Sequence, residues 1–389
     1  MPHYRVFAGA FLTQLVVIGF LFAFGLLFKE FENQYGWSRT LLSSCSSVAF
    51  FVMGVLALLT GRLSDKYGPR PVLAISGIGY GVGFVLMSQV THPWQILFIF
   101  ATFIGLGMGT HDVVTLSTVA RWFYEQRGLM TGLTKVGTAI GQIIIPPSVA
   151  YLIINYGLQK SLILMGISAI ILLFSAALVM SHPPETAEPD ATKLKQVSKS
   201  GARKSVTFKK LCAIQFLFFP TLMTIPLHIA VHGIDLGMTF GQASFLLTTI
   251  GAASIVGRLF IGFFLDLMGC RYAYLICFTP ILISLIGLLF FTHHSLIFFF
   301  MAIYGVGHGG LFAIVSPTVA GYFGMKEHGA LFGTILFFGT ISGAIGPILI
   351  GYAFDQFGNY NAGFTVLALL IAFGLTLVMT LPKWQPAVS

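Results

Sequence analysis

The segment GRLSDKYGPR, residues 61–70, returns in altered form in the second half of the chain as GFFLDLMGCR, residues 262–271. The two segments share a glycine, an aspartate, a second glycine and an arginine at the same spacing. The matched pairs, each 201 residues apart, are Gly61 and Gly262, Asp65 and Asp266, Gly68 and Gly269, and Arg70 and Arg271. Further matches keep this order: GLGMG (105–109) with GVGHG (305–309), RGLMTG (127–132) with HGALFG (328–333), and Pro146 with Pro347. The chain is therefore predicted to be an internal duplication.

The composition indicates an integral membrane protein. Of the 389 residues, 56% are hydrophobic and only 8% are charged, whereas a soluble domain carries about 25% charged residues. The 44 glycines suit closely packed membrane helices. A closed β-barrel would show alternating segments of roughly ten residues in place of long apolar runs.

Apolar runs bounded by charges and by glycine or proline turns predict twelve membrane-spanning helices. The expected limits are 6–28, 40–60, 71–90, 95–118, 129–151, 160–181, 211–233, 242–265, 272–291, 296–319, 329–353 and 361–381. The first run is too long for a signal-peptide core and is expected to be retained. The predicted fold is all-α, with two pseudo-symmetric six-helix bundles.

A polar stretch rich in Pro, Glu, Ser and Lys separates the sixth and seventh spans, and this composition is typical of disorder. We expect residues 1–181 to form the first bundle, 182–210 a cytoplasmic linker and 211–389 the second bundle. Sixteen of the 21 Lys and Arg residues fall on the side of the termini and the linker, which the positive-inside rule places in the cytosol. The net charge of +9 then reflects topology and gives no evidence for nucleic acid.

The two G-x-x-x-D-x-x-G-x-R loops resemble the signature loop of the major facilitator superfamily, along essentially the whole chain. This resemblance implies alternating access by a rocker-switch movement, with the substrate between two repeats near the middle of the membrane. It also implies a gating role for the loop residues Asp65, Arg70, Asp266 and Arg271. The alternative to a gating role is a structural one, in which the loop glycines simply allow tight turns.

Three longer segments resemble the monocarboxylate transporter family and its bacterial relatives, which include oxalate–formate exchangers. They are FKEFENQYGWSRTLLS (28–43), ARWFYEQRGLMTGLTKVGTAIG (120–141) and HIAVHGIDLGMTFGQASFLLTTIGAASIVGRLFIGFFLD (228–266). The resemblance implies that Arg258 grips the carboxylate of the cargo. Two positions depart from animal members: Ser254 replaces an aspartate and Phe22 replaces a lysine, so the proton relay of those members does not transfer.

The ionisable residues inside the predicted spans are not repeated. Arg258 corresponds to Ala57, Lys135 to Leu336, and Asp112 to Phe312. Each such group costs about 2.5–3.5 kcal/mol on insertion scales, so it is a functional candidate. A guanidinium can hold a carboxylate through two parallel hydrogen bonds, and the alternative for Arg258 is an extended side chain that reaches the membrane surface.

Lys135 and Asp112 are expected at similar depths on neighbouring helices. They either form an ion pair, or Lys135 faces the cargo as a second cation, and the two states can alternate. Asp112 and its neighbour His111 are the candidates for a coupled proton, because imidazole titrates near neutral pH. Further cavity candidates are His308, His228, Phe22, Phe312, Tyr151 and Phe338, although packed or lipid-facing positions are the alternative for each. No cofactor is expected, and the trio His228, His232 and Asp235 offers too few ligands for a metal site.

The function expected from these observations is secondary active transport of a small organic anion, most simply a monocarboxylate, by proton coupling or exchange. Two buried cations against one acid favour an anionic cargo. The alternatives are a siderophore, drug or other metabolite on the same fold, or a non-transporting sensor; no catalytic set indicates an enzyme. We expect a monomer in the plasma membrane, the inner membrane if the source is bacterial, with both termini in the cytosol.

Overall fold

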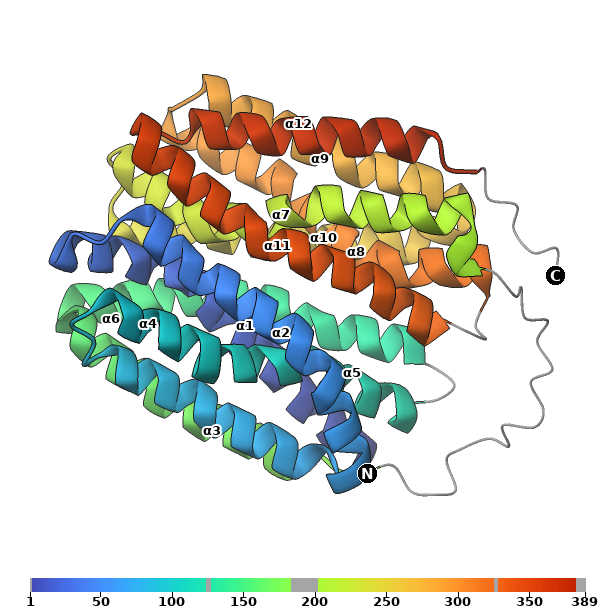
Figure 1. Cartoon of the computed structure of the whole chain (residues 1–389), viewed down its shortest axis with the longest axis horizontal. Coiled ribbons are helices and arrows are strands. Elements are labelled where there is room, and N and C mark those ends of the chain that lie inside the picture. Colours follow the sequence, from blue (N-terminus) through green and yellow to red (C-terminus); the bar gives the residue numbers. More distant parts are fainter. Residues whose placement is uncertain (1, 124–126, 183–201, 325–327, 383–389) are drawn as a thin grey trace. The chain divides into compact units, whose positions relative to one another are not determined.

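The structure is a computed structural model that describes residues 2–123, 127–182, 202–324 and 328–382 (Figure 1). All regular elements in these ranges are helical, which confirms the predicted fold class. Most of the expected linker, residues 183–201, lies outside the described ranges.

The elements follow the predicted spans closely. They are α1 (Pro2–Tyr35), α2 (Arg39–Tyr67), α3 (Pro69–Met87), α4 (Pro93–Ile99), the π-helical η1 (Phe100–Ile104), α5 (Gly105–Trp122), α6 (Arg127–Val179), the short 3₁₀ turn η4 (Ala202–Lys204), α7 (Val206–Asp235), α8 (Phe240–Met268), α9 (Cys270–Phe290), α10 (His294–Phe323), α11 (His328–Phe357) and α12 (Asn361–Met379). The expected fourth span corresponds to α4, η1 and α5 together. The fifth and sixth both lie in α6, which is interrupted at Gly157, where φ is 73°.

The repeated loops turn in the same way in both halves. Gly68 separates α2 from α3 with φ 93°, and its repeat partner Gly269 separates α8 from α9 with φ 81°. Residues other than glycine rarely adopt such positive φ angles. The backbone conformation alone therefore explains why both loops have glycine at this position, whether or not the loops take part in gating.

Contacts within the chain define two compact units. Unit 1 contains Met1–Ala191 and Leu227–Thr248, and unit 2 contains Thr192–Pro226 and Thr249–Ser389. Helix α7 thus begins in unit 2 and ends in unit 1, with the change after Pro226. This grouping differs from the expected bundle limits only in where residues 227–248 and the linker belong, and the division into six-helix bundles stays a prediction.

In unit 1, α1 and α3 both pack along α6, and α2 packs along α5 (Figure 1). Glycines bring α1 and α6 into backbone contact: a Cβ at Gly137 would lie 2.6 Å from the Phe11 carbonyl oxygen, and one at Gly141 would collide with the Leu15 carbonyl oxygen. Small residues permit this approach between membrane helices. The contact fixes α6 against α1 on the turns that follow Lys135.

In unit 2, α9 packs against α10 and α12. The glycine run of α10 allows close approach to α8, since a Cβ at Gly309 would collide with the Ser254 carbonyl oxygen. The Tyr304 hydroxyl donates to the Thr221 carbonyl at 2.9 Å and so joins α10 to α7. These contacts position Arg258, one turn along α8 from Ser254.

Candidate functional site

Lys135 and Asp112 form an ion pair in unit 1. The Lys135 Nζ donates to both carboxylate oxygens of Asp112, at 2.6 and 2.7 Å. Gln14 on α1 donates its Nε2 to the same carboxylate at 2.8 Å, to the Thr115 hydroxyl at 3.0 Å and to the His111 carbonyl at 3.1 Å. Three helices therefore orient one carboxylate toward one ammonium. The sequence analysis left open whether Lys135 pairs with Asp112 or faces the cargo. In the structure, Lys135 pairs with Asp112.

The pair is only partly buried, because the side chains of Lys135 and Asp112 are 22% and 38% exposed. His111 is buried beside it, with its Nε2 3.4 Å from the Asp112 carboxylate. The His111 Nδ1 lies 2.6 Å from the Met108 carbonyl oxygen. A carbonyl oxygen only accepts, so this nitrogen carries a hydrogen. A proton-coupling role for His111 or Asp112 stays a prediction.

Arg258 on α8 lies in an aromatic environment in unit 2. It is 8% exposed, and its guanidinium carbon is 5.7 Å from the centroid of the Phe312 ring. The His308 ring is 5.0 Å from the Phe312 ring and 5.4 Å from the Tyr304 ring. The two residues predicted on α10, His308 and Phe312, are thus next to each other, with Phe312 against Arg258. Whether any of them contacts a cargo stays a prediction.

The remaining cavity candidates are scattered. Phe22 is buried in α1, and His228 is buried with its Nε2 3.3 Å from the Ser43 hydroxyl. Tyr151 and Phe338 are 61% and 40% exposed, which fits the lipid-facing alternative. Within the described residues, no group of three His, Cys, Asp or Glu side chains could hold a metal ion.

The signature loop of the first half contains an ion pair that the sequence analysis did not include. The Asp65 carboxylate accepts from Arg121 of α5 at 2.5 Å, and the two side chains are 55% and 43% exposed. Arg70 is exposed and Arg271 is half-buried. The side chain of Asp266 lies outside the described part of the chain. The gating role of these loops stays a prediction.

A second charged cluster, which we name the four-charge network, was missed from the sequence and consists of Lys29, Glu32, Arg39 and Asp235. Arg39 Nε and Nη2 donate to the two Glu32 oxygens at 3.0 Å, and Nη1 and Nη2 donate to the two Asp235 oxygens at 2.5 and 2.9 Å. Lys29 donates to both acids, at 2.9 and 3.0 Å. The network ties the end of α1 and the start of α2 to the end of α7. The sequence signal was limited to the two bases and two acids of segment 28–43, and Asp235 in segment 228–266 shows no spacing that relates it to them.

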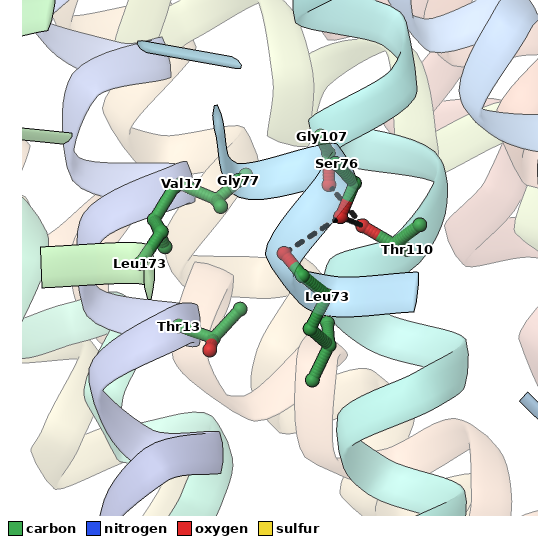
Figure 2. Close-up of a pocket in the computed structure, with 8 residues that line it drawn as sticks. All are labelled: Thr13, Val17, Leu73, Ser76, Gly77, Gly107, Thr110 and Leu173. Carbon is green, nitrogen blue, oxygen red and sulfur yellow. Dashed lines mark hydrogen bonds between the residues drawn. The ribbon is translucent and has the colours of Figure 1, made fainter. Parts of the chain in front are cut away.

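Unit 1 also contains a small pocket, which Figure 2 shows. It is lined by Thr13, Val17, Leu73, Ser76, Gly77, Gly107, Thr110 and Leu173. The Thr110 hydroxyl donates to Ser76 Oγ at 2.8 Å across one wall. The space has room for about one water molecule, so it is too small for an organic cargo.

Comparison with known proteins identifies the class of this transporter-like fold. The sequence profile of the Major Facilitator Superfamily matches residues 7–235 and 211–387. The chain therefore belongs to the Major Facilitator Superfamily, and it is an integral, multi-pass membrane protein.

Individual relatives extend over nearly the whole chain. Monocarboxylate transporter 13 of Rattus norvegicus is 27% identical over 99% of this chain and 90% of its own length. The Agnestins efflux protein AgnL12 of Paecilomyces divaricatus is 23% identical over 94% of this chain and 84% of its own length.

Two solved structures share the fold at low sequence identity. The nucleoside transporter NupG has a TM-score of 0.75 at 14% identity, with 98% of each chain covered. A bacterial homolog of the human lysosomal transporter Spinster, in an inward-facing and occupied conformation, has a TM-score of 0.74 at 13% identity, covering 99% of this chain and 98% of the other. These likenesses describe the fold alone.

Proposed function

We propose that the protein is a secondary active transporter of a small organic anion, most simply a monocarboxylate, which works by alternating access. The observation that carries this proposal is Arg258, a guanidinium that is 8% exposed within a membrane-spanning helix and lies against Phe312. The similarity to monocarboxylate transporter 13 of rat supports the same substrate class.

The chemistry of Arg258 suits a carboxylate. Its guanidinium stays protonated and presents a planar fork of donors that matches the two oxygens of a carboxylate. Placing such a charge in a membrane helix is expensive, so a ligand of opposite charge is the simplest reason to keep it there. Phe312 and His308 beside it are proposed to shape the apolar and polar sides of the binding site.

The membrane orientation is part of the proposal. A cytosolic location of both termini is supported by the basic residues, which concentrate on the side of the termini and the linker. Asp65 and Arg70 of the first signature loop are then on the cytosolic side, where the exposed Asp65–Arg121 pair is proposed to take part in gating. Energy coupling is either proton symport or anion exchange, and Asp112 and His111 are the candidate proton carriers.

Transport by purified protein in proteoliposomes tests the substrate class. Arg258→Ala is expected to lower the transport efficiency for a short monocarboxylate by at least about tenfold, because two charge-assisted hydrogen bonds are lost. Arg258→Lys keeps the charge without the fork and should recover only part of the activity. The matched control is Arg203→Ala, at an exposed position of the short turn Ala202–Lys204, which should transport like the wild type. Unchanged transport of every accepted substrate by both Arg258 variants would contradict the proposal.

A second candidate function is export of a larger organic molecule. It is favoured by the similarity to the Agnestins efflux protein AgnL12. Transport assays in proteoliposomes distinguish the two candidates. A monocarboxylate carrier accumulates short acids, whereas an exporter of larger molecules would not transport short acids and would move bulky aromatic compounds. A sensor would bind such compounds without moving them.

A further inference from the structure

We propose that His308 carries the proton of a proton–anion symport: its imidazole takes up a proton when a carboxylate neutralises the charge of Arg258. This inference rests on the proposed function, in which Arg258 holds the cargo. It deepens that function by selecting symport over exchange. It also places the coupled proton within unit 2, on His308 in place of Asp112 or His111.

Arg258 and His308 lie against the same aromatic ring in unit 2. The Arg258 guanidinium carbon is 5.7 Å from the centroid of the Phe312 ring, and the centroid of the His308 ring is 5.0 Å from it. The two residues are 8% and 1% exposed, and Arg258 is the charged side chain that acts electrostatically on His308. Because water screens buried groups little, a change of charge at Arg258 affects the binding of a proton at His308.

The first half of α7 supplies the backbone groups around His308. Pro226 has no N–H, so the Leu222 carbonyl one turn earlier lacks its usual donor within α7. This part of the backbone faces the His308 imidazole. An imidazole that turns one N–H toward a carbonyl keeps a lone pair on its other nitrogen, and this nitrogen can bind a proton. The neighbouring Tyr304 is already engaged, because its hydroxyl donates to the Thr221 carbonyl at 2.9 Å.

The other titratable groups around His308 do not change charge near neutral pH. Besides Arg258 of α8, they are Tyr304 of α10 and Cys277 of α9, whose sulfur lies against Gly310. Tyrosine and cysteine stay mostly neutral at pH 7. The charged side chains described on α7, α9 and α11 in this unit all lie near helix ends: Lys209, Lys210, Arg271 and Asp355. Among the described side chains in the interior of these helices, His308 is therefore the one that titrates in the physiological range.

The coupling follows from the charge balance at Arg258. In the empty site, the guanidinium repels a second positive charge, so the imidazole stays neutral. A carboxylate bound to Arg258 cancels that repulsion, and His308 can then accept a proton. Linkage requires the reverse as well, because a protonated His308 raises the affinity of the site for the carboxylate by the same factor.

The transported load is then one anion and one proton, with no net charge. The N–H bond on His308 is the only covalent bond that forms. Its proton comes from water on the side where the cargo enters and returns to water on the other side when the carboxylate leaves. Since the ring is 1% exposed, it exchanges protons only when the site opens. A neutral load also avoids the cost of carrying an uncompensated charge through the membrane.

Isothermal titration calorimetry of the purified protein with propionate tests the proposal. Titrations in two buffers that differ in ionisation enthalpy give the number of protons taken up per bound anion. Near pH 7, the wild type is expected to take up at least about half a proton per propionate, and its Kd should rise at least about threefold for each pH unit. His308→Gln keeps an N–H donor for the Leu222 carbonyl but cannot bind a proton. This variant should bind propionate without proton uptake and with a Kd that does not change over the same pH range.

His293→Gln is the matched control, because it makes the same substitution at an exposed residue at the start of α10, where the side chain makes no capping hydrogen bond. It should keep the proton uptake of the wild type. His308→Asn repeats the test with a shorter amide, and thermal unfolding with and without propionate checks that each variant is folded.

The outcomes separate this inference from the proposed function. If the wild type binds propionate without taking up a proton, or if His308→Gln takes up as many protons as the wild type, the inference is wrong and the proposed function stands. Loss of propionate binding in both folded amide variants would make His308 a contact of the cargo and would also overturn the inference. If the wild type binds and transports neither propionate nor any other short monocarboxylate, both are wrong.

Discussion

Replacing Arg39 by alanine should destabilise the protein strongly, because this side chain is the centre of the four-charge network. It is 2% exposed and makes four hydrogen bonds to two carboxylates. Removing one member of a buried ion pair costs about 3–5 kcal/mol. Two facts reduce that figure here: Glu32 and Asp235 are 25% and 23% exposed, and Lys29 still contacts both acids in the variant. We therefore expect a loss of about 2–3 kcal/mol.

Thermal unfolding of the purified protein in detergent measures this loss. For a unit of this size, about 2–4 °C accompanies each kcal/mol, so the expected loss of about 2–3 kcal/mol should lower Tm by about 4–12 °C. The matched control is Arg121→Ala, which breaks the exposed pair with Asp65 and should cost less than about 1 kcal/mol. If the Arg39 and Arg121 variants unfolded at the same temperature, burial of the four-charge network would not be the source of its stability, and the reasoning would be refuted.

Two further predictions concern packing in unit 1, and both are checked by the same unfolding assay. Tyr80→Phe removes the hydroxyl that donates to the buried Val17 carbonyl at 2.8 Å. The free energy of unfolding should therefore fall by about 1–2 kcal/mol. An unchanged Tm would mean that water replaces the hydroxyl. Gly141→Ala forces a methyl group onto the Leu15 backbone and should cost about 1–3 kcal/mol. Gly132→Ala on the same helix meets open space and should be neutral or stabilising, so equal losses at both glycines would contradict the close-packing argument.

The fold was predictable because its determinants are local or repeated. Apolar runs set the helix positions. The loop glycines Gly68 and Gly269 mark turns with positive φ angles, which other residues rarely adopt. The sequence also separated the fifth and sixth spans, which the structure joins in one element broken at Gly157. The π-helical segment Phe100–Ile104 was missed, because a single extra residue in a helical turn leaves no periodic signal of its own.

The candidate site was predictable only in part. Matching depth on neighbouring helices was enough to suggest that Lys135 could pair with Asp112, since helix geometry converts residue number into height. The role of Gln14 was not accessible, because its contacts join residues about a hundred positions apart that no spacing rule relates. The predicted spans 6–28 and 40–60 leave Arg39 in the segment that connects them. Its burial depends on Asp235, 196 residues away, and a sequence pattern cannot distinguish a solvated arginine from one enclosed by distant acids.

The division of α7 between the units has a consequence for biosynthesis. Unit 1 is discontinuous, because its last part, Leu227–Thr248, follows the linker and the first half of α7 in the chain. Asp235 contacts Arg39, and the Leu227 backbone lies against Gly25. Both Asp235 and Leu227 are synthesised only after the first six spans are complete. A ribosome that has reached the linker has therefore made an unfinished unit, in which Arg39 has its acid on α1 but not its acid on α7. A fragment that stops at the linker should be short-lived when produced alone, and co-production of the remainder of the chain should rescue it.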